Sequence, residues 1–203
     1  GSRISREDFA AYITQVSDVI AAMTKDGYPH PTAFEIETAV AFLFFKKENC
    51  DLVLLEVGMG GNLDATNIIK NTLLAVLVSI SMDHMSFLGN TLAQIAEKKA
   101  GIIKDGCRVV TARQKPEAMH VIERISREHG AKCTIADASE AEVLKESCLG
   151  QTIRYRGEEY EIPLAGVYQK ENAVVALNAL KVLDELGFPT AAEQKKEGLR
   201  TVN

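Results

Sequence analysis

Acidic side chains and a histidine follow two apolar runs of this sequence, where functional groups of α/β proteins commonly lie. Glu56 lies near the end of the first run, and a glycine-rich segment that contains Asp64 comes next. Asp83 and His84 follow the second run. In an open parallel sheet, ligands bind beyond the carboxyl ends of the strands. If the two runs form adjacent parallel strands, Glu56 and His84 therefore lie at the same edge.

Metal binding is the chemistry that the carboxylates at this edge favour. Mg²⁺ prefers oxygen ligands, which Glu56 and the neighbouring acids supply. Imidazole nitrogen is a softer ligand than oxygen, so the histidine is not predicted to bind Mg²⁺ from its residue type alone. A single histidine is commonly a hydrogen-bonded structural residue. The residue types alone therefore leave both a metal site and a structural pair open.

The glycine-rich segment at 58–61 matches neither common phosphate-binding pattern. Leu63 occupies the sixth position of the pattern G-x-G-x-x-G, which requires glycine there for dinucleotide binding. The pattern G-x-x-x-x-G-K-[ST] occurs nowhere in the sequence. Taken alone, the segment predicts a tight turn after a strand.

Composition narrows the class of protein. The 203 residues are 46% hydrophobic and 25% charged, which is typical of a globular domain and excludes a disordered chain. A net charge of −5 argues against a nucleic-acid partner. The four cysteines form no C-x-x-C pair, which argues against a zinc or redox motif. The uncharged stretch at 71–82 is too short to span a bilayer, so we expect a cytoplasmic protein without a membrane partner.

The elements that would position these residues alternate along the chain. Apolar residues at helical spacing predict helices at 5–27, 32–47, 92–104, 116–130 and 169–186. Short continuous apolar runs predict strands at 51–57, 73–80, 108–111 and 132–136. This alternation predicts an α/β fold with a doubly wound, mostly parallel sheet flanked by helices. The pattern of residues at 152–163 predicts a small antiparallel hairpin with Gly157 in its turn. Without linkers or repeats, residues 1–203 are predicted to form a single domain.

Five segments carry a resemblance to a known family. Residues 55–67, LEVGMGGNLDATN, closely resemble the signature LEVGLGGRLDATN of folylpolyglutamate synthases and dihydrofolate synthases, which belong to the Mur ligase superfamily. Four further segments agree in order and spacing, namely P-T-A-F-E at 31–35, S-I-x-x-D-H at 79–84, K-A-G-I at 99–102 and L-x-G-x-Y-Q-x-x-N-A at 164–173. The resemblance covers nearly the whole chain and implies the fold of the Mur ligase central domain.

The resemblance implies an ATP-dependent ligase that joins L-glutamate to folate or to dihydropteroate. ATP would phosphorylate the substrate carboxylate, and the amine of glutamate would attack the resulting acyl phosphate. Phosphoryl transfer depends mostly on positioning and charge neutralisation, so such a site needs Mg²⁺ and cationic groups more than a nucleophilic side chain. The implied partners are these small molecules, and the implied full-length protein is a monomer.

The resemblance also implies metal-binding residues. Glu56 and His84 correspond to Mg²⁺ ligands, and Asp83 is expected to orient His84. Lys99 corresponds to a lysine that family members carry as a carbamate, which supplies an oxygen ligand to a second Mg²⁺. A carbamate forms only on the neutral amine, so its pKa must fall below the usual 10.4 or so. Lys98 replaces the family's usual glutamate, and its charge favours the neutral amine of Lys99.

Nucleotide and substrate contacts follow from the same resemblance. Asn172 corresponds to the asparagine that hydrogen-bonds adenine, and Gln169 lies close to it at the start of the same helix. Asp64 corresponds to a residue that contacts the pterin substrate or orders the loop. Asn62 replaces the family's usual arginine, which removes one charge.

The family pattern extends beyond both ends of this sequence. Family members have a G-T-N-G-K-G-S phosphate loop upstream, and a W-P-G-R segment and a glutamate-binding domain downstream. We therefore expect an internal fragment of the central ATPase domain that is inactive alone. Two alternatives remain, a non-catalytic scaffold that retains the fold and a sister Mur ligase that acts on cell-wall precursors.

Overall fold

The protein, a computed structural model, divides into two compact units. The structure describes residues 3–82 and 85–202. The first unit comprises residues 1–59 and 63–68, and the second comprises 60–62 and 69–203. The single domain expected for residues 1–203 stays a prediction.

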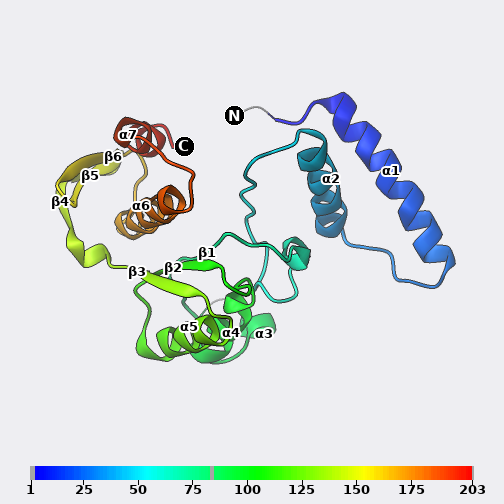
Figure 1. Cartoon of the computed structure of the whole chain (residues 1–203), viewed down its shortest axis with the longest axis horizontal. Helices are drawn as coiled ribbons and strands as arrows, with labels where there is room; N and C mark the ends of the chain where they lie inside the picture. The colour runs from blue at the N-terminus through cyan, green and yellow to red at the C-terminus, as the bar shows by residue number, and fades with distance from the viewer. Residues whose placement is uncertain (1–2, 83–84, 203) are drawn as a thin grey trace. The chain divides into compact units, whose positions relative to one another are not determined.

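Two helices with well-formed N-caps make up most of the first unit (Figure 1). The Ser5 side chain accepts a hydrogen bond from the main-chain N–H of Asp8. Thr32 and Glu35 form a capping box, which satisfies two donors at the helix start. Both predicted helices are confirmed, and a short 3₁₀ helix follows them. The elements are α1 (Arg6–Lys25), α2 (Ala33–Lys47) and η1 (Ala65–Ile68).

The strand predicted at 51–57 is wrong. These residues form irregular extended chain, and the Leu54 side chain is 92% exposed. A strand exists only through main-chain hydrogen bonds to a neighbouring strand. No described residue pairs with this segment, so its apolar composition alone does not make it a strand.

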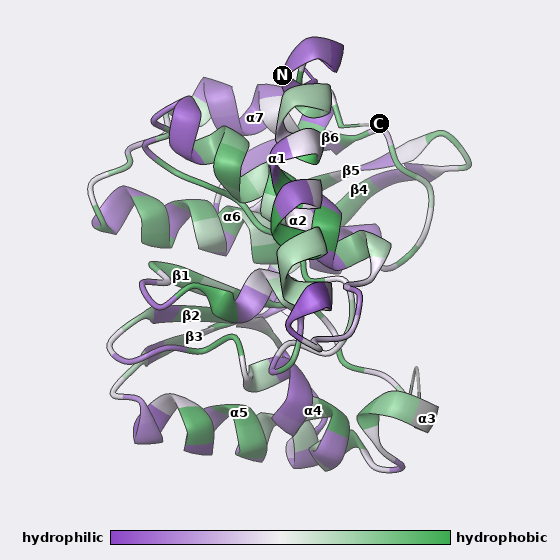
Figure 2. Ribbon diagram, turned by 90° about the vertical axis from the view of Figure 1, so that its right-hand side faces the viewer, coloured by the Kyte–Doolittle hydropathy of each residue, from purple (hydrophilic) through white to green (hydrophobic). Residues whose placement is uncertain are grey.

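A parallel three-stranded sheet forms the centre of the second unit, with strand order β1-β2-β3. Alternate residues of the middle strand point to opposite faces, as strand geometry requires. Val109 packs in the cluster with α4 and α5, whereas Val110 packs in the cluster with α6. Figure 2 shows helices on both faces of this sheet. The elements are β1 (Leu74–Leu77), α3 (Met85–Leu88), α4 (Leu92–Ala100), β2 (Arg108–Ala112), α5 (Pro116–Glu128), β3 (Lys132–Ala136) and α6 (Gln169–Glu185).

A second, antiparallel sheet lies on the other side of α6 (Figure 2). The predicted hairpin is confirmed, and its turn residues Arg156 and Gly157 have φ angles of 52° and 86°. Two positive φ values in a two-residue turn are typical of type I′, which matches the twist of paired strands. The sequence missed the third strand, β4, and the final helix, α7. The elements are η2 (Ala138–Glu140), β4 (Ala141–Ser147), β5 (Gly150–Tyr155), β6 (Glu158–Ile162) and α7 (Ala192–Arg200).

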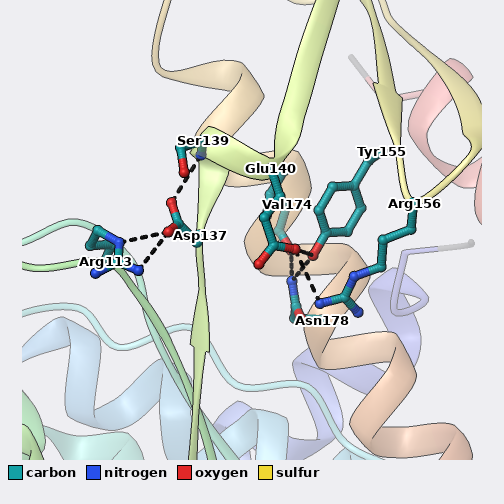
Figure 3. A network of polar contacts seen from close by, with 8 residues as sticks. All are labelled: Arg113, Asp137, Ser139, Glu140, Tyr155, Arg156, Val174 and Asn178. Atoms are coloured by element: carbon teal, nitrogen blue, oxygen red, sulfur yellow. Dashed lines mark hydrogen bonds and ion pairs between the residues drawn. The ribbon is translucent and has the colours of Figure 1, made fainter.

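A polar network joins this second sheet to α6 (Figure 3). Asn178 is 1% exposed, and its Nδ2 donates to the Tyr155 hydroxyl at 3.1 Å and to the Val174 carbonyl at 2.8 Å. The Tyr155 hydroxyl donates in turn to Glu140 at 3.4 Å. A buried amide requires such partners, because an unsatisfied buried polar group is destabilising. The network therefore helps to fix the antiparallel sheet on α6.

The architecture confirms the predicted α/β class. A parallel sheet covered on both faces by helices is the doubly wound arrangement, and the antiparallel sheet is an addition to it. Within the described residues, none of the helices is both long enough and apolar enough to cross a membrane.

Candidate functional site

Asp64 orders the turn that follows the glycine-rich segment. Its Oδ2 accepts a hydrogen bond from the main-chain N–H of Met59 at 2.9 Å. Its Oδ1 accepts from the main-chain N–H and the hydroxyl of Thr66, at 3.0 and 2.6 Å. Burial acts to raise the pKa of Asp64, but these hydrogen bonds outweigh burial and hold the pKa below its ordinary value. The loop-ordering role expected for Asp64 thus has a direct geometric basis, and its contact with substrate stays a prediction.

The glycine turn at 60–62 packs against the C-terminal end of α4, within the second unit. The main-chain N–H of Asn62 donates to the carbonyl oxygen of Lys98 at 3.0 Å. A Cβ at Gly61 would lie 2.8 Å from the carbonyl oxygens of both Lys98 and Lys99. Two motifs that are 37 residues apart in the sequence, at Gly61 and Lys98, are therefore in main-chain contact.

Lys99 lies in the last turn of α4, and its side chain is half-buried. Its amine has no ion-pair or hydrogen-bond partner among the residues that the structure describes. The predicted carbamate would form at this amine.

Glu56 and the two residues at 83–84 are the other predicted metal-binding positions. The Glu56 side chain is exposed, in the extended segment of the first unit. Asp83 and His84 lie outside the described residues. Within the described ranges, no three His, Cys, Asp or Glu side chains are grouped so as to hold a metal ion. The carboxylate of Glu56 nevertheless has the donor chemistry that Mg²⁺ prefers.

Gln169 and Asn172 meet at the start of α6. The Nδ2 of Asn172 donates to Oε1 of Gln169 at 3.2 Å, so the structure brings these two predicted residues together. Asn172 is exposed and Gln169 is half-buried. A helix start with exposed amides presents hydrogen-bond donors and acceptors to solvent, which suits recognition of a polar ring or a phosphate.

Sequence reasoning missed Gln114, which lies just beyond the end of β2. Its side chain is buried, and its Nε2 donates to the carbonyl of Val78 at 2.9 Å and to the Thr111 hydroxyl at 3.1 Å. Its Oε1 accepts from the main-chain N–H of Ile80 at 2.9 Å. A glutamine two residues after a strand was the available signal, but its main-chain partners, Val78 and Ile80, lie more than 30 residues away.

The family is shown by comparison with known sequences. A sequence model of the Mur ligase middle domain matches residues 8–180. The dihydrofolate synthase/folylpolyglutamate synthase of Bacillus subtilis is 39% identical over 194 residues, which cover 91% of this chain and 44% of that protein.

Solved structures have the same fold. Mycobacterium tuberculosis folylpolyglutamate synthase complexed with ADP and AMPPCP superposes with a TM-score of 0.82 at 33% identity, covering 98% of this chain and 47% of that one. A folylpolyglutamate synthase in complex with AMPPCP and folate superposes with a TM-score of 0.80 at 29% identity, covering 94% and 48%. The chain spans less than half the length of each of these relatives. Its sequence and its fold together show that this chain belongs to the Mur ligase middle-domain family.

Proposed function

We propose that this chain is the central ATP-binding part of a folylpolyglutamate synthase that also accepts dihydropteroate. The observation that carries the proposal is the segment at 55–67. Its sequence resembles the family signature, Asp64 orders its turn, and its glycine turn packs on the helix that carries Lys99. Relatives in complex with ATP analogues and with folate support the nucleotide and the substrate class.

The reaction is an amide ligation in two transfers. The γ-phosphoryl group of ATP passes to a folate carboxylate oxygen, which gives ADP and an acyl phosphate. The amine of L-glutamate then attacks the acyl carbon, loses a proton and expels inorganic phosphate. The protein's part is to position the reactants and to stabilise the transferred charge. Asn172, with Gln169 beside it, would hydrogen-bond the adenine and fix the nucleotide.

Glu56, His84 and Lys99 would hold Mg²⁺, which neutralises phosphate charge when it is bound. For Lys99 this requires that its neutral amine add to CO₂, forming an N–C bond and releasing one proton. Lys99 lies in the last turn of α4 with its side chain half-buried. Asp64 would hold the loop against the pterin, and we infer a cytoplasmic, monomeric full-length protein.

The full-length protein that contains this chain provides the test. We expect ATP-dependent incorporation of L-glutamate into tetrahydrofolate and dihydropteroate, and no incorporation by the 203-residue chain alone. Glu56→Gln and His84→Ala should each raise the Mg²⁺ concentration that gives half-maximal rate. Unchanged rates at limiting Mg²⁺ would refute the metal-ligand assignment. Ligation to a cell-wall precursor instead of a folate would refute the substrate class, and absence of any ligation would support a scaffold.

A further inference from the structure

Gly101 is the C-cap of α4, and its backbone conformation does not require glycine. Its φ and ψ angles are −61° and −8°, which any residue adopts. A Cβ at this position would, however, lie 2.6 Å from the Cβ of Asn62, 2.7 Å from its Cα and 2.9 Å from its main-chain nitrogen. Cβ atoms essentially never approach other atoms so closely. The absence of a side chain at Gly101 is therefore needed for close contact with Asn62.

The contact is reciprocal at Gly61. A Cβ there would lie 2.8 Å from the carbonyl oxygens of Lys98 and Lys99, and the positive φ of 153° disfavours other residues. Between the two glycines, the main-chain N–H of Asn62 donates to the carbonyl of Lys98 at 3.0 Å. We call this set, Gly61, Asn62 and Gly101 with the carbonyls of 98 and 99, the glycine interlock.

The interlock acts on the part of α4 that is least constrained by the helix itself. The last four carbonyls of a helix have no partner within it, and terminal turns fray. The Asn62 N–H donates at 3.0 Å to the Lys98 carbonyl, which also accepts a longer hydrogen bond of 3.4 Å from Gly101, and the two close approaches hold the last turn against the glycine turn. Lys99 is the residue whose carbonyl faces Gly61, and it lies two positions before Gly101. The interlock therefore holds the main chain from which the Lys99 side chain extends.

We propose that Gly61 and Gly101 are positioning residues for Lys99, because they fix the main chain of the helical turn that carries the amine that would capture CO₂. The inference rests on the carbamate role proposed above for Lys99. The close approaches and the hydrogen bond of the interlock involve the main-chain N–H, Cα and Cβ of Asn62. An arginine has all three, so these contacts are compatible with the arginine that the family has at position 62.

The test compares two glycine-to-alanine changes in the full-length protein. Gly101→Ala adds a methyl group against Asn62, whereas Gly198→Ala adds the same group in α7 with nothing within 4 Å. With ¹³C-labelled bicarbonate, the parent and Gly198→Ala should show the carbamate carbon resonance in ¹³C NMR. In Gly101→Ala its intensity should fall at least tenfold, with a lower kcat and an unchanged KM for ATP. A misfolded protein would not keep that KM.

Each outcome decides between the proposals. Equal carbamate and equal kcat in Gly101→Ala and the parent would overturn the positioning role and leave the role of Lys99 standing. Lack of carbamate in the parent would overturn both, whereas the effects of Glu56→Gln and His84→Ala test the metal site independently. If Gly101→Ala does not fold, the rate of amide hydrogen exchange at Asn62 in the parent protein tests the interlock instead. Slow exchange at Asn62 supports the interlock, and exchange at the rate of an exposed loop overturns it.

Discussion

Gln114 accepts a hydrogen bond from the main-chain N–H of Ile80 at 2.9 Å, at the point where the chain leaves β1. Main-chain pairing between β1 and β2 ends at Leu77 and Thr111. Beyond this point the side-chain amide of Gln114 makes hydrogen bonds of the kind that the main chain of a neighbouring strand would make, because it also donates to the carbonyl of Val78. One side chain therefore extends the hydrogen bonding of β1 by three residues toward position 83.

Replacement of Gln114 by alanine is expected to lower the free energy of unfolding by about 1–3 kcal/mol, because it leaves buried main-chain groups unsatisfied. Hydrogen exchange at the amide of Ile80 should become faster at the same time. Urea unfolding and exchange NMR measure the two effects. Gln94→Ala is the matched control, since its Oε1 also accepts from a main-chain N–H, that of Asn90, but at an exposed position. If Gln114→Ala lowered the free energy of unfolding no more than Gln94→Ala does, this result would contradict the bridging role of Gln114.

The lowered pKa of Asp64 predicts a stability contribution that depends on pH. A carboxyl group whose pKa is lower in the folded state than in the unfolded state stabilises the fold above its unfolded pKa of about 3.9. That contribution is lost as the pH falls through the folded pKa. Asp64→Asn should therefore lower the unfolding free energy by about 1–2 kcal/mol at pH 7 and by much less near pH 2. Asp18→Asn, at an exposed site on α1, is the control substitution, and a constant effect of Asp64→Asn across this range would refute the charge argument.

The buried pair Tyr155 and Asn178 is expected to be energetically coupled. Tyr155→Phe removes the hydroxyl that accepts from Asn178 and donates to Glu140, so it should lower stability by about 1 kcal/mol. A double-mutant cycle with Asn178→Ala should give a coupling energy of at least about 0.5 kcal/mol. Tyr28→Phe is the control, because that ring is 62% exposed. Additive effects in the cycle would mean that the hydrogen bond contributes nothing net.

Two apolar runs show which part of the fold the sequence could predict. The run at 73–80 became β1 because β2 lies beside it and supplies hydrogen bonds. The run at 51–57 has a similar composition, yet it remains extended chain, and none of the residues that the structure describes pairs with it as a strand. The apolar composition of a run indicates that the run tends to be buried. Strand formation depends on a second segment, distant in the sequence, that pairs with it. Helices were easier to predict because their hydrogen bonds and caps are local, as at Ser5 and Thr32.

The same distinction applies to the candidate site. The motif around Asp64 was recognisable because residues 55–67 resemble the family signature, and the hydrogen-bond partners of Asp64, Met59 and Thr66, also lie within five residues of it. Gln114 was missed because its contacts with Val78 and Ile80 depend on the pairing of two strands. Local patterns thus indicated which residues matter, and the folded chain was needed to show what holds them.

Asn172 carries the last prediction, which concerns the nucleotide. Its amide is oriented by Oε1 of Gln169 at the start of α6, so Asn172→Ala should weaken adenine binding in the full-length protein. We expect the KM for ATP to rise about tenfold, which corresponds to about 1.4 kcal/mol, with kcat nearly unchanged. Gln169→Ala should raise this KM less, because it leaves the Asn172 amide present but less well oriented. Asn90→Ala is the control, as the hydrogen bond of that residue to Gln94 uses only its main-chain N–H. An unchanged KM in Asn172→Ala would remove Asn172 from the nucleotide site, since a residue that contacts the adenine cannot be truncated without loss of affinity.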